Sequence, residues 1–463
     1  MVVTIVVLLI LAGVSISLIL DNNGIIKKSK DARREYRQAQ TNEQADLSDL
    51  SDLIDEATAE PTPKVNVNTK AEDNSTINGK KGNSNNPTIP KGYIPINTET
   101  SSWGDGTSAP TQDSVDHGLV IKGDSDDNEW VWIPVDETTL ATMCNTSNET
   151  EYTLCGTSGE TAVKTKLYSS TITIGKDSNT ETITRTTPGT STSGSYREPD
   201  LVVKNNSGNE DCDAKEEYYK TILGFDSKEK MAEAFVDEYK EMLESIQKYG
   251  GFYIGRYELS EAGVQKDKAT LTNTSWYNLY KKCTELQASD KVKTRMIWGC
   301  QWDVTMNWLI SSGAKTSDEV NKDSSSWGNY KGTSVKADDG TTEIKASEKM
   351  DVLNTGITTF TMANNIYDLA GNCWEWTQDA VSTSFRDTRG GAYGVGYGSY
   401  SPASSSSGSN PVNDSYSKRF SSHFNNKVAL NSRAWAPEWR IIRECKKFCV
   451  KNKYSKKYFL MVK

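Results

Sequence analysis

The pattern of hydrophobic and polar positions divides the chain into an apolar start, a polar stretch and a folded remainder. Residues 1–20, MVVTIVVLLILAGVSISLIL, contain no charged side chain. Twenty helical residues span roughly 30 Å, the thickness of the hydrocarbon core of a bilayer. A cleaved secretory signal would have a basic start and a shorter apolar run. We therefore expect a retained transmembrane helix over residues 1–20.

Two polar segments follow this apolar helix. Residues 21–58 begin with a cluster of Lys and Arg at 27–37 and continue with good helix formers, which predicts a helical stem. Residues 59–87 are rich in Pro, Asn, Ser, Thr and Lys and contain few large apolar side chains. Burial of such a segment would not offset the loss of its chain entropy. We expect a disordered linker there.

From residue 88 to residue 430 the pattern predicts one mixed domain of short strands and few helices. Residues 117–122 and 129–135 combine β-branched and aromatic side chains between Gly and Asp, as is typical of strands. Residues 136–215 are dominated by Thr, Ser, Asn and Gly, which indicates an insertion of hairpins and loops with a weak core. After Thr377 the chain becomes rich in Gly, Ser, Tyr and Asn, and we expect irregular backbone.

One long amphipathic helix is predicted between Asp226 and Gly250. Asp226 offers an N-cap with Glu229 three residues later, as in a capping box. Glycine at 250 and 251 is typical of a helix end. An apolar stripe at helical spacing connects these ends and consists of Met231, Phe235, Tyr239, Met242 and Ile246. Shorter helices are expected over residues 276–286 and 301–311.

Composition narrows the possible functions. The net charge is −9, which argues against nucleic-acid binding because neutralising phosphates requires a surplus of Lys and Arg. The two histidines, His117 and His423, leave little for a histidine-rich zinc site or a Ser-His-Asp triad. Eight cysteines in 463 residues do not make a disulfide scaffold, although Cys144 and Cys155 are close enough in sequence to close a small loop.

Four short blocks, in a fixed order, carry a resemblance to a known family. They read GFYIGRYE at 251–258, MIWGCQWD at 296–303, NIYDLAGNCWEWT at 365–377 and RGGAY at 389–393. Together they resemble the formylglycine-generating-enzyme (sulfatase-modifying factor) branch of the C-type-lectin-like fold. The third block is the most specific, because its Gly-Asn-x-Trp-Glu-Trp-Thr run is hard to match by chance. The resemblance implies an irregular α+β domain, with a strand at the first block and a helix carrying a buried Trp at the second.

The third block has a further implication. In the resembled family, carbonyls and a carboxylate of this segment hold a structural calcium ion, and oxygen ligands from irregular backbone are those that Ca²⁺ prefers. By position, Glu375 would supply the carboxylate, and Gly371 and Cys373 would supply backbone oxygens. The alternative is that Glu375 hydrogen-bonds within its own turn. Trp374 and Trp376 are expected in the core, since alternation turns at least one of them inward.

The fourth block bears on catalysis. The family's oxidases place two copper-binding cysteines shortly after the Arg-Gly-Gly, and soft thiolates suit Cu(I). Here residues 394–400 read GVGYGSY and contain no cysteine. We therefore expect no copper and no enzymatic activity, and a copper-dependent formylglycine-generating oxidase is the least favoured interpretation.

The segment after the fourth block, residues 394–416, has the composition of adaptable binding loops. Tyr supplies contact area at low entropic cost, and Ser, Gly and Asn supply hydrogen bonds. The segment resembles the variable region of lectin-like proteins diversified by retroelements. The expected ligand-contacting residues are Tyr393, Tyr397, Tyr400, Asn410, Asn413 and Tyr416. The alternative is an ordinary Ser/Gly-rich loop without a ligand.

The N-terminus resembles that of type IV pilin-like proteins of Firmicutes, although the Lys/Arg-Gly cleavage motif before the apolar run is missing. By charge alone, residues 21–58 would lie in the cytoplasm, whereas the pilin resemblance places them outside. We follow the resemblance because long domains translocate largely regardless of charge. The sequence thus predicts a single-pass, surface-exposed, lectin-like protein that binds a protein or a glycan. The alternative is a pilin-like structural subunit that self-assembles.

The C-terminus departs from the family pattern. The resembled proteins close with a Gly-Phe-Arg-x-Ala strand that completes the core, whereas residues 431–463 here form an atypical basic tail. A change of reading frame in the gene would explain both differences. In that case the last core strand would be missing.

Overall fold

The computed structural model divides the chain into two compact units, residues 1–61 and residues 62–463. The described residues all belong to the second unit and are 62–143, 149–155, 163–168, 170–176, 179–185, 195–204, 207–286, 290–396, 406–409, 424–425 and 428–432. The predicted membrane helix, the stem and the tail beyond Ser432 lie outside them. Within these ranges, no helix combines the length and the apolarity that crossing a membrane requires.

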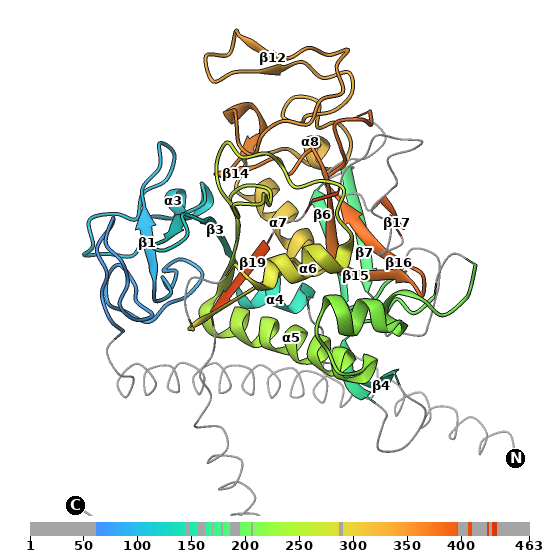
Figure 1. The fold of residues 1–463 in the computed structure, drawn as a ribbon. Helices are drawn as coiled ribbons and strands as arrows, with labels where there is room; N and C mark the ends of the chain where they lie inside the picture. Colours follow the sequence, from blue (N-terminus) through green and yellow to red (C-terminus); the bar gives the residue numbers. More distant parts are fainter. Residues whose placement is uncertain are drawn as a thin grey trace, which may run out of the picture. The chain divides into compact units, whose positions relative to one another are not determined.

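A six-stranded antiparallel sheet forms the centre of this unit (Figure 1). Its strands, in spatial order, are β1 (Tyr93–Ile96), β2 (Val120–Gly123), β3 (Glu129–Pro134), β9 (Gly251–Gly255), β19 (Val428–Ser432) and β10 (Val292–Met296). The strands predicted at 117–122, 129–135 and in the first block are present. Trp130 and Trp132 of β3 pack into one hydrophobic cluster, whereas Val131 and Ile133 pack into a second. Both faces of the sheet are therefore covered, which explains the nearly continuous apolar run in β3.

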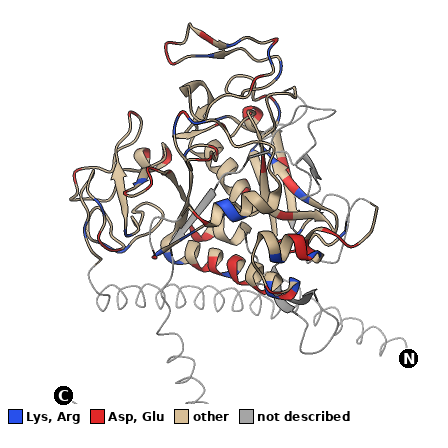
Figure 2. Cartoon of the chain, viewed as in Figure 1, with Lys and Arg blue, Asp and Glu red and all other residues tan. Residues whose placement is uncertain are grey.

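Helices cover the sheet and carry the remaining core. They are α3 (Gln112–Asp116), α4 (Glu137–Met143), α5 (Lys228–Tyr249), α6 (Trp276–Thr284), α7 (Gly299–Ser311) and α8 (Ser317–Asn321), with short helical turns η2 (Cys212–Ala214), η3 (Glu217–Ile222) and η4 (Thr359–Thr361). The helix predicted over 226–250 is confirmed as α5, and its apolar stripe is buried. Ser227, rather than Asp226, is the N-cap and accepts from the N–H of Lys230. The opposite face of α5 is exposed and charged (Figure 2).

Residues 62–87 differ from the disordered linker that their composition predicts. Val65, Ala71 and Ile77 are buried in the first hydrophobic cluster. The side-chain amide of Asn86 donates to Asn78 Oδ1 and to the carbonyl of Lys81, each at 3.1 Å. Short polar side chains thus satisfy the backbone of this segment, so a few apolar anchors suffice to fold it. The domain begins at least 26 residues before the expected boundary at residue 88, since its first described residue is at position 62.

The insertion forms two hairpins, as its alternating pattern predicts. They consist of β4 (Glu149–Cys155) with β5 (Val163–Tyr168), and β6 (Ser170–Lys176) with β7 (Asn179–Arg185), the latter extended by β8 (Ser195–Tyr196). Hydrogen bonds fasten the second hairpin to the helices: Asn307 of α7 accepts from Gly175 at 3.2 Å, and Asn321 of α8 donates to Ile174 at 3.1 Å. The described residues also form two small antiparallel ribbons. They are β11 (Val335–Lys336) with β12 (Glu343–Lys345), and β13 (Met362–Ala363) with β14 (Ile366–Tyr367).

The region after the third block is more regular than expected. Instead of a turn and irregular backbone, the chain forms a second sheet in the order β17 (Ser406–Ser409), β16 (Phe385–Arg389), β15 (Trp374–Ser382) and β18 (Phe424–Asn425). Trp374, Glu375 and Trp376 therefore lie within a strand, and all three are buried. Up to Arg389 the expected irregular backbone is wrong, because polar side chains of the β15–β16 hairpin are buried in ion pairs rather than solvated. For residues 397–405 and 410–423 the prediction lies outside the described residues.

A closing core strand is present, contrary to the consequence expected of a changed reading frame. Val428–Ser432 form β19, which lies between β9 and β10. Leu430 pairs with Thr294 on one side and with Tyr253 on the other. This strand completes the central sheet although its sequence lacks the family's Gly-Phe-Arg-x-Ala pattern.

Candidate functional site

The fold brings the first and third blocks together. The carboxylate of Glu258 accepts from the Asn372 side-chain amide at 2.5 Å and from the Cys373 N–H at 3.2 Å. The Arg256 guanidinium donates to the carbonyl of Asn365 at 3.2 Å and forms an ion pair with Glu129 at 2.6 Å. The segment that precedes β15 is thus held by charged side chains at both ends: by Arg256 at Asn365, and by Glu258 at Asn372 and Cys373.

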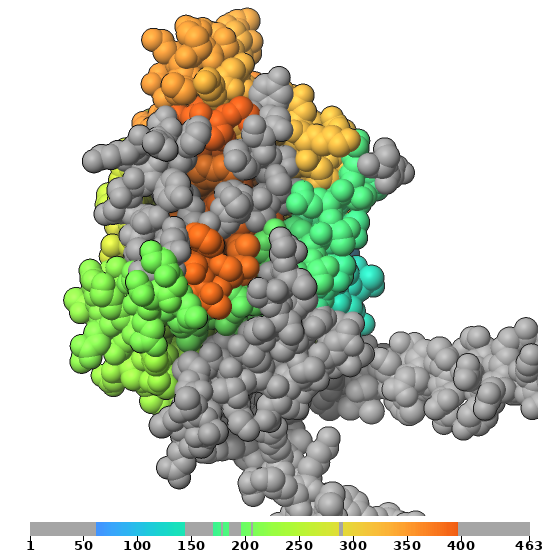
Figure 3. Space-filling view, turned by 90° about the vertical axis from the view of Figure 1, so that its right-hand side faces the viewer, coloured from blue at the N-terminus to red at the C-terminus, as the bar shows by residue number. Residues whose placement is uncertain are grey.

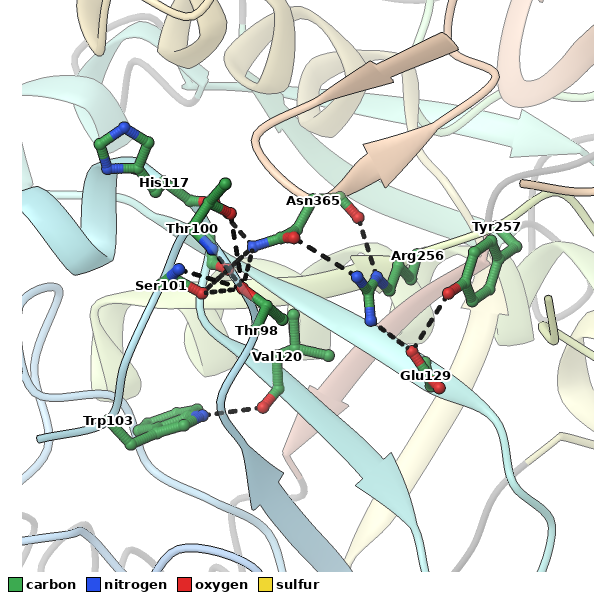
Figure 4. Close-up of polar contacts among 11 residues, drawn as sticks. Thr98, Thr100, Ser101, Trp103, His117, Val120, Glu129, Arg256, Tyr257 and Asn365 are labelled. Atoms are coloured by element: carbon green, nitrogen blue, oxygen red, sulfur yellow. Dashed lines mark hydrogen bonds and ion pairs between the residues drawn. The ribbon is translucent and has the colours of Figure 1, made fainter. Parts of the chain in front are cut away.

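Asn365 extends this contact to the N-terminal part of the domain (Figure 4). Its side-chain nitrogen lies 3.1 Å from Ser101 Oγ, 3.1 Å from Thr98 Oγ1 and 2.9 Å from the carbonyl of Gly118. Its backbone adopts φ 64°, a left-handed conformation that Asn tolerates better than most residues. The segment before β2 and the third block are therefore held as one piece.

The second and fourth blocks meet through buried charges. Arg389 pairs with Asp303 of α7 at 3.2 Å and with Asp387 at 2.7 Å, and all three side chains are fully buried. The Gln378 side-chain amide donates to the carbonyl of Met296 at 2.7 Å. The first block thus contacts the third, the second contacts the fourth, and the third and fourth pair with each other in the β15–β16 hairpin, where Glu375 lies opposite Arg389.

The end of the insertion adds a second buried ion-pair cluster to the same hairpin. Arg386 pairs with Asp213 at 2.7 Å, and its guanidinium lies 4.4 Å from the ring centroid of Trp276. Arg197 pairs with Asp200 at 3.0 Å, also inside the protein. Burial raises the pKa of Asp200 to about 6, although the nearby Arg197 lowers it. The insertion is thus tied to the scaffold by charge as well as by its hairpins.

Gly390 borders a small space lined by oxygen atoms. A Cβ built on Gly390 would lie 3.2 Å from the carbonyl oxygen of Leu369, 3.7 Å from Glu375 Oε2 and 3.8 Å from the carbonyl oxygen of Cys373. Glu375 is fully buried, as is Leu369. A carboxylate and two carbonyls that converge on a space kept open by a glycine are chemically suited to Ca²⁺. We call this space, bounded by Leu369, Cys373, Glu375 and Gly390, the Gly390 cradle.

The cradle includes two of the three residues that the sequence proposes for calcium. Glu375 and Cys373 face it, whereas Gly371 is positioned by its N–H, which donates to the carbonyl of Gly390 at 2.8 Å. Leu369 and Gly390 were not predicted. The Gly-Gly pair of the fourth block could have pointed to Gly390, because Gly390 has φ 86°, a conformation in which a side chain is strained.

Among the described residues, no group of three or more His, Cys, Asp or Glu side chains is arranged to hold a metal ion. Cys212, Cys283, Cys300 and Cys373 are all buried. Burial, followed by the charge of Glu258, raises the pKa of the Cys373 thiol. The thiol of Cys373 is therefore protonated at neutral pH, so it is its backbone oxygen that suits a hard cation.

The predicted ligand-contacting tyrosines have different outcomes. Tyr393 is 4% exposed and belongs to the core, and its role as a ligand contact stays a prediction. Burial raises its pKa to about 12. Tyr397, Tyr400, Asn410, Asn413 and Tyr416 lie outside the described residues. The aromatic ring at position 393 therefore anchors the chain where the predicted binding segment leaves the scaffold.

Both ends of the stretch between Gly396 and Val428 are attached to the scaffold. Before it, Lys331 donates its N–H to the carbonyl of Val395 at 3.0 Å. Within and after it, β17 pairs with β16, β18 pairs with β15, and β19 enters the central sheet. In Figure 3, orange atoms of the part of the chain that precedes residue 397 are exposed on the face shown. We call residues 397–427 the display segment.

Comparison with known proteins adds one neighbour. No family model matches the chain, and no curated protein matches it. Among solved structures, Treponema denticola variable protein 1 is similar to 62% of this chain over 99% of its own length, with 15% sequence identity and a TM-score of 0.21. A TM-score this low does not carry the fold or the activity of one chain over to the other.

Proposed function

We propose that this protein is a surface-exposed binding protein in which a rigid scaffold presents the display segment to a protein or glycan ligand. The observation that carries this proposal is the attachment of the segment at both ends. It starts where Val395 is held by Lys331, and it ends at β19, which lies between β9 and β10 in the central sheet. Loops placed in this way on a rigid framework are the usual carriers of binding residues.

The composition of the display segment supports binding. It contains Tyr397, Tyr400 and Tyr416 among many Ser, Asn and Gly residues. Tyr offers a large amphipathic surface with only two side-chain torsions to immobilise, and Ser and Asn offer hydrogen bonds that adapt to different partners. Lectin-like and retroelement-diversified proteins, which the sequence resembles, use such segments in this way.

We further propose that the scaffold does not catalyse a reaction and that a structural calcium ion occupies the Gly390 cradle. Glu375 would supply the carboxylate, and Cys373 and Leu369 would supply carbonyl oxygens. The ion would hold the start of β15 beside Gly390. We also propose that residues 1–20 anchor the protein in the cell membrane with residues 62–432 outside the cell. A Lys-Gly leader site encoded in the DNA upstream of Met1 would favour the pilin-like alternative.

The binding proposal is tested by screening the full chain against arrays of glycans and of surface proteins. The variant Tyr397→Ala/Tyr400→Ala removes two aromatic side chains of the display segment. The matched control Thr171→Ala/Thr182→Ala removes two exposed side chains of the β6–β7 hairpin. We expect the screen to identify a ligand that the wild type and the control bind equally well. The tyrosine variant should bind this ligand about tenfold more weakly, or not at all. Equal binding by all three chains would contradict the proposal.

A further inference from the structure

The ribbon of β11 and β12 belongs to an excursion of the chain whose two ends meet at its base. Residues 331–349, which we call the arm, leave the scaffold after Tyr330, form the ribbon at the top of Figure 1 and return. The Gly332 N–H donates to the carbonyl of Ser347 at 3.0 Å, so the outgoing and returning chains lie side by side at the base. Its strands have two and three residues, and such a short ribbon is marginal on its own. The arm therefore depends on what holds its base.

Lys345, the last residue of β12, connects the two sides of the base. Its side chain is buried, with 2% exposed. The ammonium donates to the carbonyls of Tyr330 at 3.0 Å and Thr333 at 2.8 Å on the outgoing side, and to that of Lys349 at 3.3 Å on the returning side. We call these three carbonyl oxygens the carbonyl cage. Since an ammonium has three N–H donors, each donor has one partner in the cage.

The carbonyl cage requires the charged form of Lys345. A carbonyl oxygen can only accept, and a neutral amine has too few N–H donors for three such oxygens. Burial lowers the pKa of Lys345, whereas the charges of Asp351, Glu348 and Glu343 raise it. The carbonyls replace the water that a buried ammonium loses, as carbonyl oxygens replace the hydration shell of K⁺ in channel filters. The arrangement is therefore that of a site for a monovalent cation.

The outgoing side of the cage is attached to the scaffold. Tyr330 is fully buried, and its hydroxyl donates to the carbonyl of Gly390 at 2.8 Å. The returning side belongs to a turn that the Lys349 N–H closes by donating to the carbonyl of Ala346 at 3.0 Å. No residue of the arm, all of which the structure describes, belongs to either hydrophobic cluster. The arm can therefore open at its base without exposing the core of the scaffold.

We propose that the carbonyl cage is a monovalent-cation site that the chain fills with its own ammonium, and that Lys345 thereby clasps the arm shut at its base. The ligands are backbone oxygens, so the site is retained when the lysine is replaced. A free ammonium ion, which has the same donors, would then occupy the cage in its place. With the cage empty, the arm opens while the scaffold stays folded.

The clasp is tested by amide hydrogen exchange on the full chain. Lys345→Met keeps an apolar stem and removes the ammonium. We expect exchange at Gly332 and Ala337, whose N–H groups bond within the arm, to accelerate at least about tenfold, which corresponds to about 1.4 kcal/mol of local stability. Gly250, whose N–H bonds Ile246 at the end of α5, should keep its rate.

Lys349→Ala is the matched control. It removes an exposed ammonium from a residue of the cage but keeps the carbonyl that the cage uses. It should exchange like the wild type. Unchanged rates in the arm of Lys345→Met, acceleration of the same size in Lys349→Ala, or acceleration that extends equally to Gly250 would overturn the proposal.

Chemical rescue separates a cation site from a packing role. Lys345→Ala removes both the ammonium and its stem, and exchange at Gly332 should accelerate as in Lys345→Met. Ammonium chloride should then restore slow exchange, whereas tetramethylammonium chloride at the same ionic strength should not, because it has no N–H to donate. Ammonium should leave the wild type unchanged, since its cage is already filled. If the two salts act equally on Lys345→Ala, the lysine holds the arm by packing alone and the cation site is refuted.

Discussion

The side-chain amide of Asn372 donates to the carboxylate of Glu258 over 2.5 Å, and both side chains are fully buried. The Oδ1 atom of Asn372 accepts from the Asn329 side chain and from the Leu353 N–H, each at 2.9 Å. Its backbone carbonyl accepts from the Tyr393 N–H at 3.0 Å. Asn372 thus contacts four separate segments, three through its side chain and one through its backbone carbonyl, and it does so at φ 56°. Asn372 therefore holds the turn that precedes β15 against the segments around it.

Asn372→Ala should therefore destabilise the domain by about 2–4 kcal/mol, because it removes several buried hydrogen bonds and leaves Ala in a left-handed conformation. The free energy of unfolding in urea measures this. Asn354→Ala is the control, since Asn354 is exposed and bonds Asp267 at 3.0 Å. It should cost less than about 0.5 kcal/mol. Equal losses in the two variants would show that Asn372 has no special role.

Ile77→Ala should destabilise the domain by about 2–4 kcal/mol, the usual cost of truncating a fully buried Ile. Ile77 is fully buried in the first hydrophobic cluster. Lys81→Ala, an exposed substitution in the same segment, should leave the midpoint of urea unfolding within experimental error. If Ile77→Ala also leaves it unchanged, residues 62–87 are the linker that their composition predicts.

The surroundings of Asn372 and of Ile77 show which parts of the fold can be predicted from the sequence and which cannot. The apolar stripe of α5 and the four blocks were recognisable because periodicity and rare residue combinations act locally. Residues 62–87 were not, because Asn and Thr side chains replace apolar burial as the means of folding them. The β15–β16 hairpin was missed for a related reason. Charged side chains such as Asp387 and Arg389 are mostly exposed in proteins, and only the fold brings Asp303 to them.

Arg389→Met should destabilise the domain by about 3–5 kcal/mol at pH 7. It removes the cation between Asp303, Asp387 and Asp379, which lie 3.2, 2.7 and 4.0 Å from the guanidinium. The three buried carboxylates would then lack the cation that pairs with them. Lys240→Met, on the exposed face of α5, serves as the control. A loss no larger than that of the control would contradict a stabilising role of these ion pairs.

Asp200→Asn should change how stability depends on pH. The folded-state pKa of Asp200 is raised from 3.8 to about 6 by burial, so the folded protein binds a proton more tightly than the unfolded chain. The charged form is therefore a cost that is fully present above pH 6 and disappears as the pH falls toward 4, by about 3 kcal/mol in total. We expect the unfolding free energy of the variant, relative to wild type, to fall by this amount between pH 7 and pH 4. A constant difference across this range would be inconsistent with a raised pKa.

The claim that the display segment binds a ligand is tested most directly by calorimetry with the ligand that the arrays identify. The account predicts that Tyr397→Ala/Tyr400→Ala raises the dissociation constant about tenfold or more and leaves the melting temperature unchanged, because these residues follow the anchored segment that ends at Gly396. A dissociation constant equal to that of the wild type would contradict it.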